Sequence, residues 1–371
     1  MSDETWAIIA GGGTAGHVVP GLAVAKALVA RGHPTETIHW VGGRRWTEGE
    51  VVGAAGFEST LLPGRGIQRR LTADNLGAVW GLTQAGAQAL ALVRERRPAV
   101  VLAMGGYASV TCALAAAALR VPLVVAEQNA VPGASNRLVG RFAAACAVPF
   151  PGTPLPRAVV TGNPVRSEIL GVDRSESGRR AARAALGLPP DRTVVAVFGG
   201  SLGALRLNEA VLGAFAPWGG RADLAVRHVV GERDWTTVTG RAPDLDGLFW
   251  QPVRYDDQRE LSLAAADVAV SRAGGNTVAE LAAVGLPSVL VPLPGAPGDH
   301  QTANARHLVD AGMAVLVPDG EMSAARLVRE VDGLLGDPAR LAAMEEAAAR
   351  IGRRDAADAV AELVERSGRR D

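Results

Sequence analysis

Two stretches of the sequence share one pattern, in which a short apolar run ends in a glycine-rich turn and a helix-length segment follows. The first is AIIAGGGTAGH (residues 7–17) and the second is VVAVFGGSLGA (residues 194–204). Turns of this kind join a parallel strand to the next helix in Rossmann-like units. The repeat therefore predicts two such units of similar size.

Short apolar runs alternate with helix-length segments along most of the chain, which predicts an α/β fold with parallel sheets and helices on both faces. The runs are WAIIA, TIHWVG, AVVLAM, PLVVAE and AVVTG in the first half, and TVVAVFGG, LAVRHVV, DVAVSRAG and PSVLVP in the second. We expect two Rossmann-like domains facing a cleft, at residues 1–165 and 166–345. A C-terminal helix within 346–371 is expected to pack back on the first domain, and the charged stretch Gly171–Ala184 is expected to be the joint.

Composition excludes several classes of protein. Lys+Arg and Asp+Glu number 38 each, a balance that argues against a dedicated nucleic-acid binder. Cys112 and Cys146 stand in apolar contexts, as buried thiols of a cytosolic protein do. The uncharged run at 98–119 is broken by Gly105 and Gly106, so it predicts a strand and a helix rather than a membrane span. No basic, apolar secretory leader is visible in MSDETW.

The first turn matches G-x-G-x-x-G through Gly11, Gly13 and Gly16, the pattern of dinucleotide-binding turns. An NAD enzyme would carry an acid at the end of the second strand, but TIHWVGGRR ends in glycines and arginines. An NADP enzyme using Arg44 or Arg45 remains open. His17 follows the last glycine, where a helix N-terminus disfavours imidazolium and would leave a neutral base. A capping or surface histidine is the alternative.

The second half contains a larger group of polar residues at expected strand ends. RAGGNT (residues 272–277) ends a strand and opens a helix, which makes an anion site suited to a pyrophosphate. Glu280 follows on that helix, where a carboxylate could accept from two ribose hydroxyls. DHQTANA then offers Asp299, His300, Gln301 and Asn304. Each alone is ordinary loop or cap chemistry, but together they favour a nucleotide-sugar site.

Seven motifs occur in order: GGGTAGHVVPGLAVAKAL, MGGYAS, EQNAVPG, GNPVR, GGSLGA, SRAGGNTVAE and DHQTANA. This set resembles the MurG family of peptidoglycan UDP-N-acetylglucosamine transferases. The resemblance implies a two-domain GT-B glycosyltransferase fold, without a cofactor or a metal. It further implies inverting transfer of N-acetylglucosamine from UDP-N-acetylglucosamine to the C4 hydroxyl of undecaprenyl-pyrophosphoryl-N-acetylmuramyl pentapeptide, the step from lipid I to lipid II.

The resemblance also implies roles for matched residues. On the second domain, Arg166 and Ser201 would contact the nucleotide diphosphate, the backbone near Asp256 would bind the uracil, and His300 and Gln301 would bind the sugar. The phosphates and ribose would be held by Gly275, Asn276, Thr277, Val278, Ala279 and Glu280. On the first domain, Thr14, Ala15, Gly16 and Asn129 would close over the donor sugar, and His17, Tyr107, Glu127 and Asn129 would face the acceptor. His17 would be the general base; Glu127 is the second candidate, or it orients a backbone turn.

Some positions depart from the family pattern. Ala126 stands where a histidine is frequent, and MGGYAS continues with Val110 and Thr111 rather than Gly-Pro. Arg259 stands where a methionine is usual, and Leu205 where an arginine is common, with Arg206 adjacent. These differences concern the acceptor side and the packing on the uracil side.

A lipid-linked acceptor implies a membrane surface. In the region Gly64–Gln84, arginines accompany five apolar residues: Ile67, Leu71, Leu76, Val79 and Trp80. Such a patch suits peripheral docking on the anionic inner-membrane surface, at the cytoplasmic face. The alternative is a helix whose apolar face packs inward. Asp244-Leu245-Asp246 matches D-x-D literally, but it precedes a strand rather than ending one, so no metal site is expected.

Other functions remain open on the sequence. A transferase of the same fold could act on another lipid or on a natural-product acceptor. A UDP-N-acetylglucosamine 2-epimerase could share the donor site without needing a lipid patch. A non-catalytic nucleotide-binding protein would keep the glycine turns but would not need His17.

Overall fold

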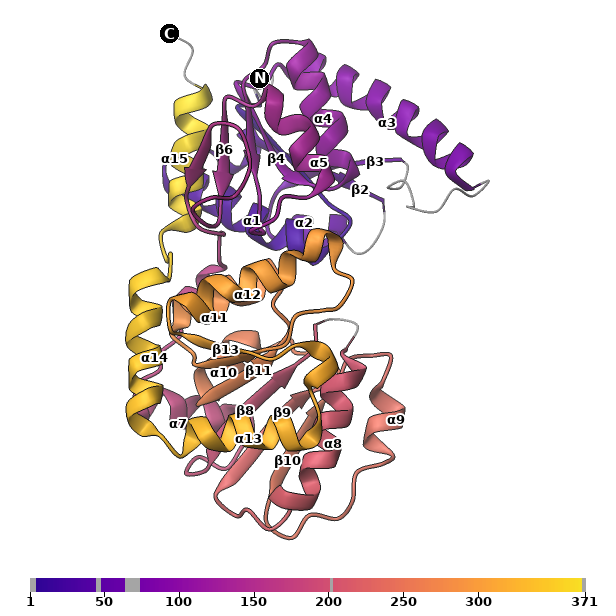
Figure 1. Cartoon of the computed structure of the whole chain (residues 1–371). Coiled ribbons are helices and arrows are strands. Elements are labelled where there is room, and N and C mark those ends of the chain that lie inside the picture. The colour runs from indigo at the N-terminus through magenta and orange to yellow at the C-terminus, as the bar shows by residue number, and fades with distance from the viewer. Residues whose placement is uncertain (1–4, 45–47, 64–73, 201–202, 369–371) are drawn as a thin grey trace. The chain divides into compact units, whose positions relative to one another are not determined.

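The computed structural model describes residues 5–44, 48–63, 74–200 and 203–368, except the side chains of residues 48, 74–80 and 82. The chain divides into two compact units (Figure 1). One comprises Met1–Arg166 together with Arg354–Asp371, and the other comprises Ser167–Arg353.

The first unit contains a parallel seven-stranded sheet with the order β3-β2-β1-β4-β5-β6-β7. Its strands are β1 (Ala7–Gly11), β2 (Ile38–Gly43), β3 (Glu58–Leu62), β4 (Val100–Gly105), β5 (Leu123–Ala126), β6 (Ala145–Val148) and β7 (Ala158–Val160). Its helices are α1 (Ala15–Ala30), α2 (Glu48–Ala54), α3 (Asp74–Arg96), α4 (Tyr107–Ala118), α5 (Ala134–Val139) and α15 (Ala356–Gly368).

Alternation along the buried strands builds one core on each face of this sheet. Ile9 packs in a cluster with residues of α1 and α15, including Leu363. Its neighbour Ile8 packs in a second cluster with residues of α3, α4 and α5, including Val93 and Cys112. Because successive side chains of a strand point to opposite faces, a strand buried on both faces reads as an unbroken apolar run.

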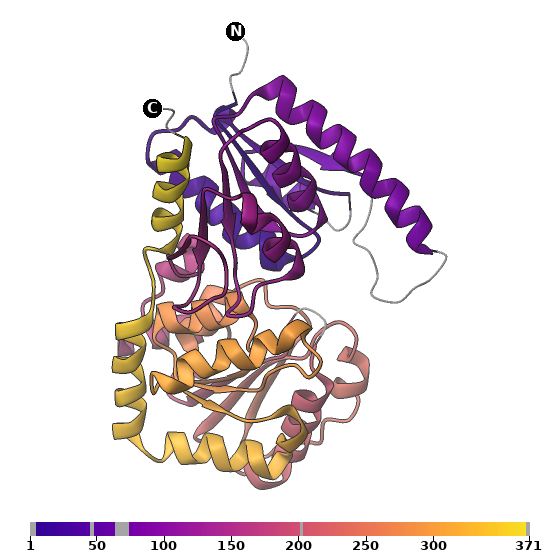
Figure 2. The same cartoon turned by 45° about the horizontal axis from the view of Figure 1, so that its top comes forward.

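The C-terminal helix α15 belongs to the first unit, beside α1, and both views of the chain show it along this unit (Figures 1 and 2). Glu365 on α15 accepts hydrogen bonds from Arg31 at 2.8 Å and from the His33 ring at 3.1 Å. The His33 ring in turn stacks on Trp6, with ring centroids 3.6 Å apart. The chain therefore returns to its first unit after completing the second.

The second unit contains a parallel six-stranded sheet with the order β10-β9-β8-β11-β12-β13. Its strands are β8 (Thr193–Phe198), β9 (Leu224–Val229), β10 (Phe249–Val253), β11 (Val268–Ser271), β12 (Ser288–Leu290) and β13 (Ala314–Leu316). Its helices are α6 (Ser167–Leu170), α7 (Glu176–Ala185), α8 (Leu205–Trp218), α9 (Trp235–Thr239), α10 (Arg259–Ala265), α11 (Gly275–Val284), α12 (His300–Asp310), α13 (Ala324–Leu335) and α14 (Pro338–Ile351).

Both sheets reverse their strand order at one place, between β1 and β4 in the first unit and between β8 and β11 in the second. Ligands of open α/β sheets bind outside the carboxyl ends of the strands at such a switch point. The α/β fold with two Rossmann-like sheets that the sequence predicts is therefore present. The topology directs attention to the segments that follow these four strands.

The stretch Gly171–Ala184 is not the joint that its charge suggests, because it forms most of α7 within the second unit. Ser175 caps this helix by accepting from the amide of Gly178. Arg183 donates to the Ala265 carbonyl at 2.9 Å and to Asp267 at 2.7 Å, so its charge is paired in the interior. The boundaries between the units lie at Arg166/Ser167 and at Arg353/Arg354. The sequence analysis expects them after residues 165 and 345.

Both cysteines are buried, and burial raises the pKa of the Cys112 thiol to about 12 and that of Cys146 to about 11. Thiols of this kind are inert packing groups. Within the described part of the chain, no helix combines the length and the apolar character needed to cross a bilayer.

Candidate active site

The turns after β1 and β4 pack backbone against backbone, which only glycine permits here. Gly106 has φ +84, and a Cβ added to it would lie 2.4 Å from the Gly12 carbonyl oxygen. A side chain at this position would therefore be strained by both conformation and space. The two turns at the switch point of the first sheet form one close-packed surface.

His17 lies in the first turn of α1 against this surface. Its Nδ1 is 3.0 Å from the Gly12 carbonyl oxygen, and because a carbonyl only accepts, Nδ1 must carry the hydrogen. The lone pair of the neutral ring is then on Nε2. A Cβ on Gly105, where φ is +116, would lie 2.8 Å from Nε2, so this glycine makes room for the imidazole.

Burial is the largest cause that lowers the pKa of His17, while the hydrogen bond to Gly12 and the charge of Glu127 raise it. The ring is therefore neutral near pH 7, as the sequence suggests. The leading cause differs from the one that the sequence indicates: removal from water disfavours the charged ring more than the field of the helix N-terminus does. A neutral imidazole with its lone pair on Nε2 can accept a proton.

Glu127 follows β5, and its buried carboxylate ties together the turn that comes after it. One oxygen accepts from the backbone amides of Gln128 and Asn129, each at 3.0 Å, and from the Asn129 side chain at 3.2 Å. The other accepts from the Gly133 amide at 3.0 Å and from the Asn136 side chain at 2.9 Å. A carboxylate saturated in this way favours the turn-orienting role over that of second base.

Tyr107 begins α4 directly after the Gly105–Gly106 turn. Its hydroxyl donates to the Leu62 carbonyl at 2.9 Å. A Cβ on Gly43 would lie 2.6 Å from the same hydroxyl, so the ring fills the space at the ends of β2 and β3. Tyr107 therefore joins these strand ends to the turn that accommodates His17.

In the second unit, α11 opens with its N-terminus free of a side-chain cap. Gly274 is the N-cap and makes no side-chain cap hydrogen bond, since it has no side chain. The amides of Gly275, Asn276 and Thr277 and the helix dipole are suited to a phosphate. Val278 is buried in this helix, so only its backbone could contribute to ligand binding.

Gln301 at the start of α12 holds the loop that leads into α11. Its Oε1 accepts from the Ala273 amide at 3.1 Å and from the Leu293 amide at 2.9 Å. Asn304, one helical turn later, donates to the Ala273 carbonyl at 3.0 Å. His300 beside them donates from Nδ1 to the Pro297 carbonyl at 2.8 Å. His300, Gln301 and Asn304, polar residues that the sequence singles out, thus lie close together beside the carboxyl ends of β11 and β12.

Glu280 and Asp256 are both buried in ion pairs. Glu280 accepts from Arg259 Nε at 3.1 Å. Asp256 accepts from Arg227 at 3.0 Å and from the Ser262 hydroxyl at 2.8 Å, which leaves the neighbouring backbone as the part of this loop that could bind a base. Arg166 is the last residue of the first unit before the boundary, and Ser201 lies outside the described residues.

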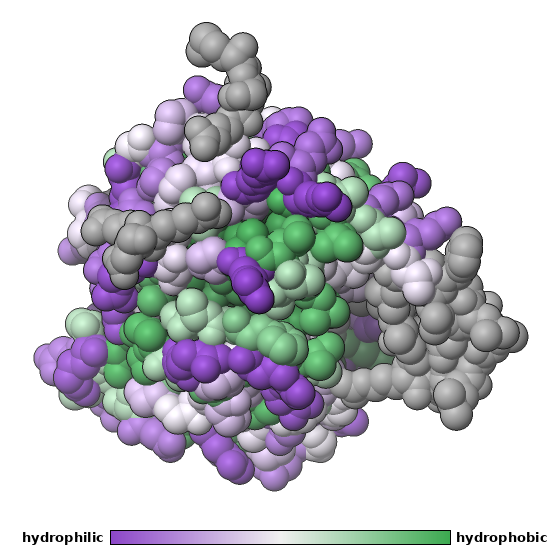
Figure 3. Space-filling view, turned by 90° about the horizontal axis from the view of Figure 1, so that it is seen from above, coloured by the Kyte–Doolittle hydropathy of each residue, from purple (hydrophilic) through white to green (hydrophobic). Residues whose placement is uncertain are grey.

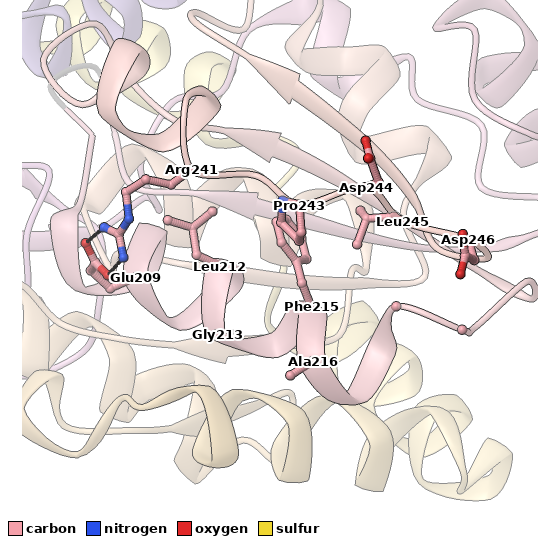
Figure 4. Close-up of a pocket in the computed structure, with 12 residues that line it drawn as sticks. Glu209, Leu212, Gly213, Phe215, Ala216, Arg241, Pro243, Asp244, Leu245 and Asp246 are labelled. Carbon is pink, nitrogen blue, oxygen red and sulfur yellow. Dashed lines mark hydrogen bonds and ion pairs between the residues drawn. The ribbon is translucent and has the colours of Figure 1, made fainter.

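The D-x-D sequence precedes the edge strand β10 and so lies at its amino end, away from the carboxyl ends of the strands where the candidate site is built. Asp244, Leu245 and Asp246 line a cavity of about 650 Å³ beside α8, in the loop that precedes β10. The two carboxylates point in different directions, and the nearby Arg241 is paired with Glu209 (Figure 4). Among the residues that the structure describes, no three His, Cys, Asp or Glu side chains are grouped to hold a metal ion.

Two family models match the chain. The glycosyltransferase family 28 N-terminal domain matches residues 7–148, and the corresponding C-terminal domain matches residues 194–360. A Nocardioides protein named UDP-N-acetylglucosamine--N-acetylmuramyl-(pentapeptide) pyrophosphoryl-undecaprenol N-acetylglucosamine transferase is 43% identical over 96% of both chains. The chain belongs to this family of glycosyltransferases.

Two solved structures agree with the fold. The crystal structure of Acinetobacter baumannii MurG covers 97% of this chain and 99% of its own, with a TM-score of 0.76 and 27% identity. UDP-GlcNAc 2-epimerase from Neisseria meningitidis, bound to UDP-GlcNAc, gives a TM-score of 0.69 at 13% identity, covering 97% of this chain and 100% of its own. The second likeness concerns the fold alone, which family 28 transferases share with such epimerases.

Sequence reasoning gave turn orientation as the alternative role of Glu127 but did not identify the donors that its carboxylate holds, the Asn136 amide among them. It missed the pairing of Arg259 with Glu280 altogether. A buried carboxylate directly after an apolar strand, as in PLVVAE, is the one signal that could have indicated the first. The second joins residues on different helices and leaves no local signal.

Glu127→Gln is expected to lower stability by about 1–3 kcal/mol, because one carboxylate oxygen becomes an amide that faces backbone N–H donors. Urea unfolding measures the change. Glu36→Gln, an exposed carboxylate on the same unit, should stay within about 0.5 kcal/mol of the wild type. An unchanged stability of the Glu127 variant combined with a large loss of kcat would instead make this carboxylate a base.

Proposed function

We propose that this glycosyltransferase transfers N-acetylglucosamine from UDP-N-acetylglucosamine to the C4 hydroxyl of undecaprenyl-pyrophosphoryl-N-acetylmuramyl pentapeptide, converting lipid I to lipid II in peptidoglycan synthesis. The observation that carries the proposal is His17, a neutral imidazole whose lone pair is on Nε2 at the switch point of the first sheet. The names of its relatives support both substrates. A nucleotide-binding protein without catalysis would not need such a base.

The chemistry follows from this placement. The acceptor C4 oxygen attacks the anomeric carbon of N-acetylglucosamine, and the bond from that carbon to the diphosphate oxygen breaks. The hydroxyl proton passes to His17 Nε2, and UDP leaves with the bonding electron pair. Attack from the face opposite the leaving group turns the α linkage into a β-1,4 linkage. A positioned base of this kind contributes about 10²–10⁴-fold to the rate.

The donor is assigned to the second unit. The uncapped start of α11 offers backbone amides to the diphosphate, and Arg166 would add a positive charge as UDP departs. Glu280 would accept from the ribose hydroxyls, and the backbone near Asp256 would bind uracil. Gln301 and His300 would bind the sugar, with Thr14, Ala15, Gly16 and Asn129 closing over it. Tyr107 would contact the acceptor.

We also propose peripheral docking on the anionic inner-membrane surface, at the cytoplasmic face, as cell-wall synthesis on a lipid carrier requires. The residues expected for it lie outside the described part: Ile67 and Leu71 altogether, and the side chains of Leu76, Val79 and Trp80. Described residues of the same unit support docking. Leu138 is 43% exposed and Phe142 51% exposed, beside the exposed Arg137 and Arg141.

Apolar side chains rimmed by arginines suit a surface of anionic headgroups. The view onto this unit shows apolar surface gathered between polar residues (Figure 3). The role in cell-wall biogenesis, and through it in cell shape and division, follows from the proposed reaction.

Two incubations separate this function from its rivals. With UDP-N-acetylglucosamine alone the protein should release neither UDP nor free sugar, and a soluble lipid I analogue should start the release of UDP and form the disaccharide. N-acetylmannosamine in the first incubation, free or still linked to UDP, would identify a 2-epimerase, the rival that shares this fold. Transfer to another lipid or to a natural-product acceptor, with no transfer to the lipid I analogue, would show that the proposed acceptor is wrong and that the protein is a transferase with a different acceptor.

His17→Ala is expected to lower kcat by about 10²-fold or more while leaving the affinity for UDP-N-acetylglucosamine nearly unchanged, because a base acts only in the transition state. Since burial lowers the pKa of His17, wild-type kcat/KM should fall with decreasing pH only below about 6.5, and the variant should lack this limb. His307→Ala, on α12, is the matched control. Normal kcat in the His17 variant would contradict the mechanism.

Glu280→Ala is expected to weaken UDP binding about ten- to a hundredfold, since a charge-assisted hydrogen bond contributes roughly 1.5–3 kcal/mol. Calorimetric titration with UDP measures the change in affinity. The same titration of the wild type should give equal UDP affinity in magnesium and in excess chelator, because no metal is expected at the site. Glu346→Ala, an exposed carboxylate of the same unit, should bind normally. Unchanged UDP binding by a folded Glu280 variant would place the ribose elsewhere.

Replacing Leu138 and Phe142 together by serine is expected to reduce sedimentation with phosphatidylglycerol vesicles, because both side chains are exposed and lose their apolar contact with the lipid. Turnover of a short-chain, water-soluble acceptor should persist. Tyr255→Ser, an exposed aromatic residue of the second unit, is the control. Equal sedimentation of the double variant and the wild type would exclude this surface.

A further inference from the structure

Arg259 is the first residue of α10 and joins three segments of the second unit through one guanidinium group. Its Nε donates to Glu280 Oε2 on α11 at 3.1 Å. Its guanidinium carbon lies 3.7 Å from the centroid of the Phe198 ring, the last residue of β8. Its Nη1 lies 3.9 Å from Asp256 Oδ2 in the loop before α10. Phe198 ends β8 and Glu280 lies on the helix that follows β11, the two strands at the switch point of the second sheet, while Asp256 follows the edge strand β10.

This cluster is shielded from water. The side chains of Arg259, Glu280 and Asp256 are 13%, 10% and 8% exposed. Ion pairs removed from water in this way gain in electrostatic strength and are held in one geometry. The carboxylate of Glu280 is therefore held by a neighbour on another helix.

The far side of the cluster is anchored as well. Asp256 accepts from Arg227 at 3.0 Å and from Ser262 at 2.8 Å, and Arg227 also donates to Ser262 at 2.7 Å. Arg259 thus lies between an immobilised carboxylate and the one on α11. Its planar guanidinium can stack on Phe198 while donating along its edge, which an ammonium group cannot do equally well.

We propose that Arg259 is a positioning residue of the donor site, which orients the Glu280 carboxylate toward the ribose hydroxyls and thereby sets the preference for a ribonucleotide. The inference rests on the proposed function, in which Glu280 binds the ribose. The sequence has an arginine here, so the carboxylate is oriented by a charge and a donated hydrogen bond, neither of which an uncharged apolar side chain supplies.

The experiment measures binding of UDP, 2′-deoxy-UDP and 3′-deoxy-UDP by calorimetry to the wild type and to Arg259→Met, Arg259→Gln and Arg259→Lys. The matched control is Arg254→Met. Arg254 also pairs with a carboxylate, Glu232, and lies over an aromatic ring, Trp235, but it is exposed. Thermal unfolding identifies any variant that has lost its fold, in which case the remaining Arg259 variants decide.

The wild type should prefer UDP over at least one deoxy analogue by about tenfold, the worth of one charge-assisted hydrogen bond. Arg259→Met and Arg259→Gln should lose about tenfold in UDP affinity and most of this preference, while analogue binding changes little. Arg259→Lys should retain part of the preference, and the control Arg254→Met should retain all of it. In turnover, the Met and Gln variants should raise KM for the donor and leave kcat nearly unchanged.

An undiminished ribose preference in folded Arg259→Met or Arg259→Gln, combined with its loss in Glu280→Ala, overturns this inference and leaves the proposed function intact. Retention of the preference in Glu280→Ala overturns both, because the ribose then lies elsewhere. An equal loss in Arg254→Met also overturns the inference, since any arginine of this region would have the same effect.

Discussion

The site of the first unit depends on the backbone contact between the turns after β1 and β4. The Gly12 carbonyl is approached by Gly106 on one side and accepts from His17 on the other. Any Cβ at Gly106 would displace that carbonyl, and with it the hydrogen bond that places the proton on Nδ1. The orientation and tautomer of the candidate base are thus consequences of how closely two strand ends pack.

Elsewhere in the molecule, buried charges fix the turns and helices around the candidate site. Glu127 gathers the turn after β5, and the Arg259–Glu280 pair joins α10 to α11. Charges in the interior are costly unless all their hydrogen-bonding capacity is used, so a satisfied network is rigid. In both units, rigid turns at the carboxyl ends of parallel strands hold the residues proposed for chemistry and binding.

The apolar runs predicted most strands of both sheets, including the three-residue strands β7 and β12, but missed β3, β6, β10 and β13. β3 carries a glutamate, a serine and a threonine, which interrupt the apolar pattern, and β6 and β13 are apolar runs of only four and three residues. β10 contains Pro252, which an edge strand tolerates because one side of it needs no ladder hydrogen bonds. The charged run at 171–184 was misread as a joint, since local charge does not reveal that Arg183 is paired with Asp267 inside the unit.

By itself the sequence determined the α/β class, the two Rossmann-like units and the candidate residues, because these depend on local patterns: apolar runs, glycine turns and polar residues just after strands. Tertiary structure decided which nitrogen of His17 carries the proton, why its pKa is lowered, and that Glu127 holds a turn. It also decided that Arg259 faces Glu280, 21 positions further along the chain. Burial and hydrogen-bond partners depend on segments distant in sequence, and only packing brings them together.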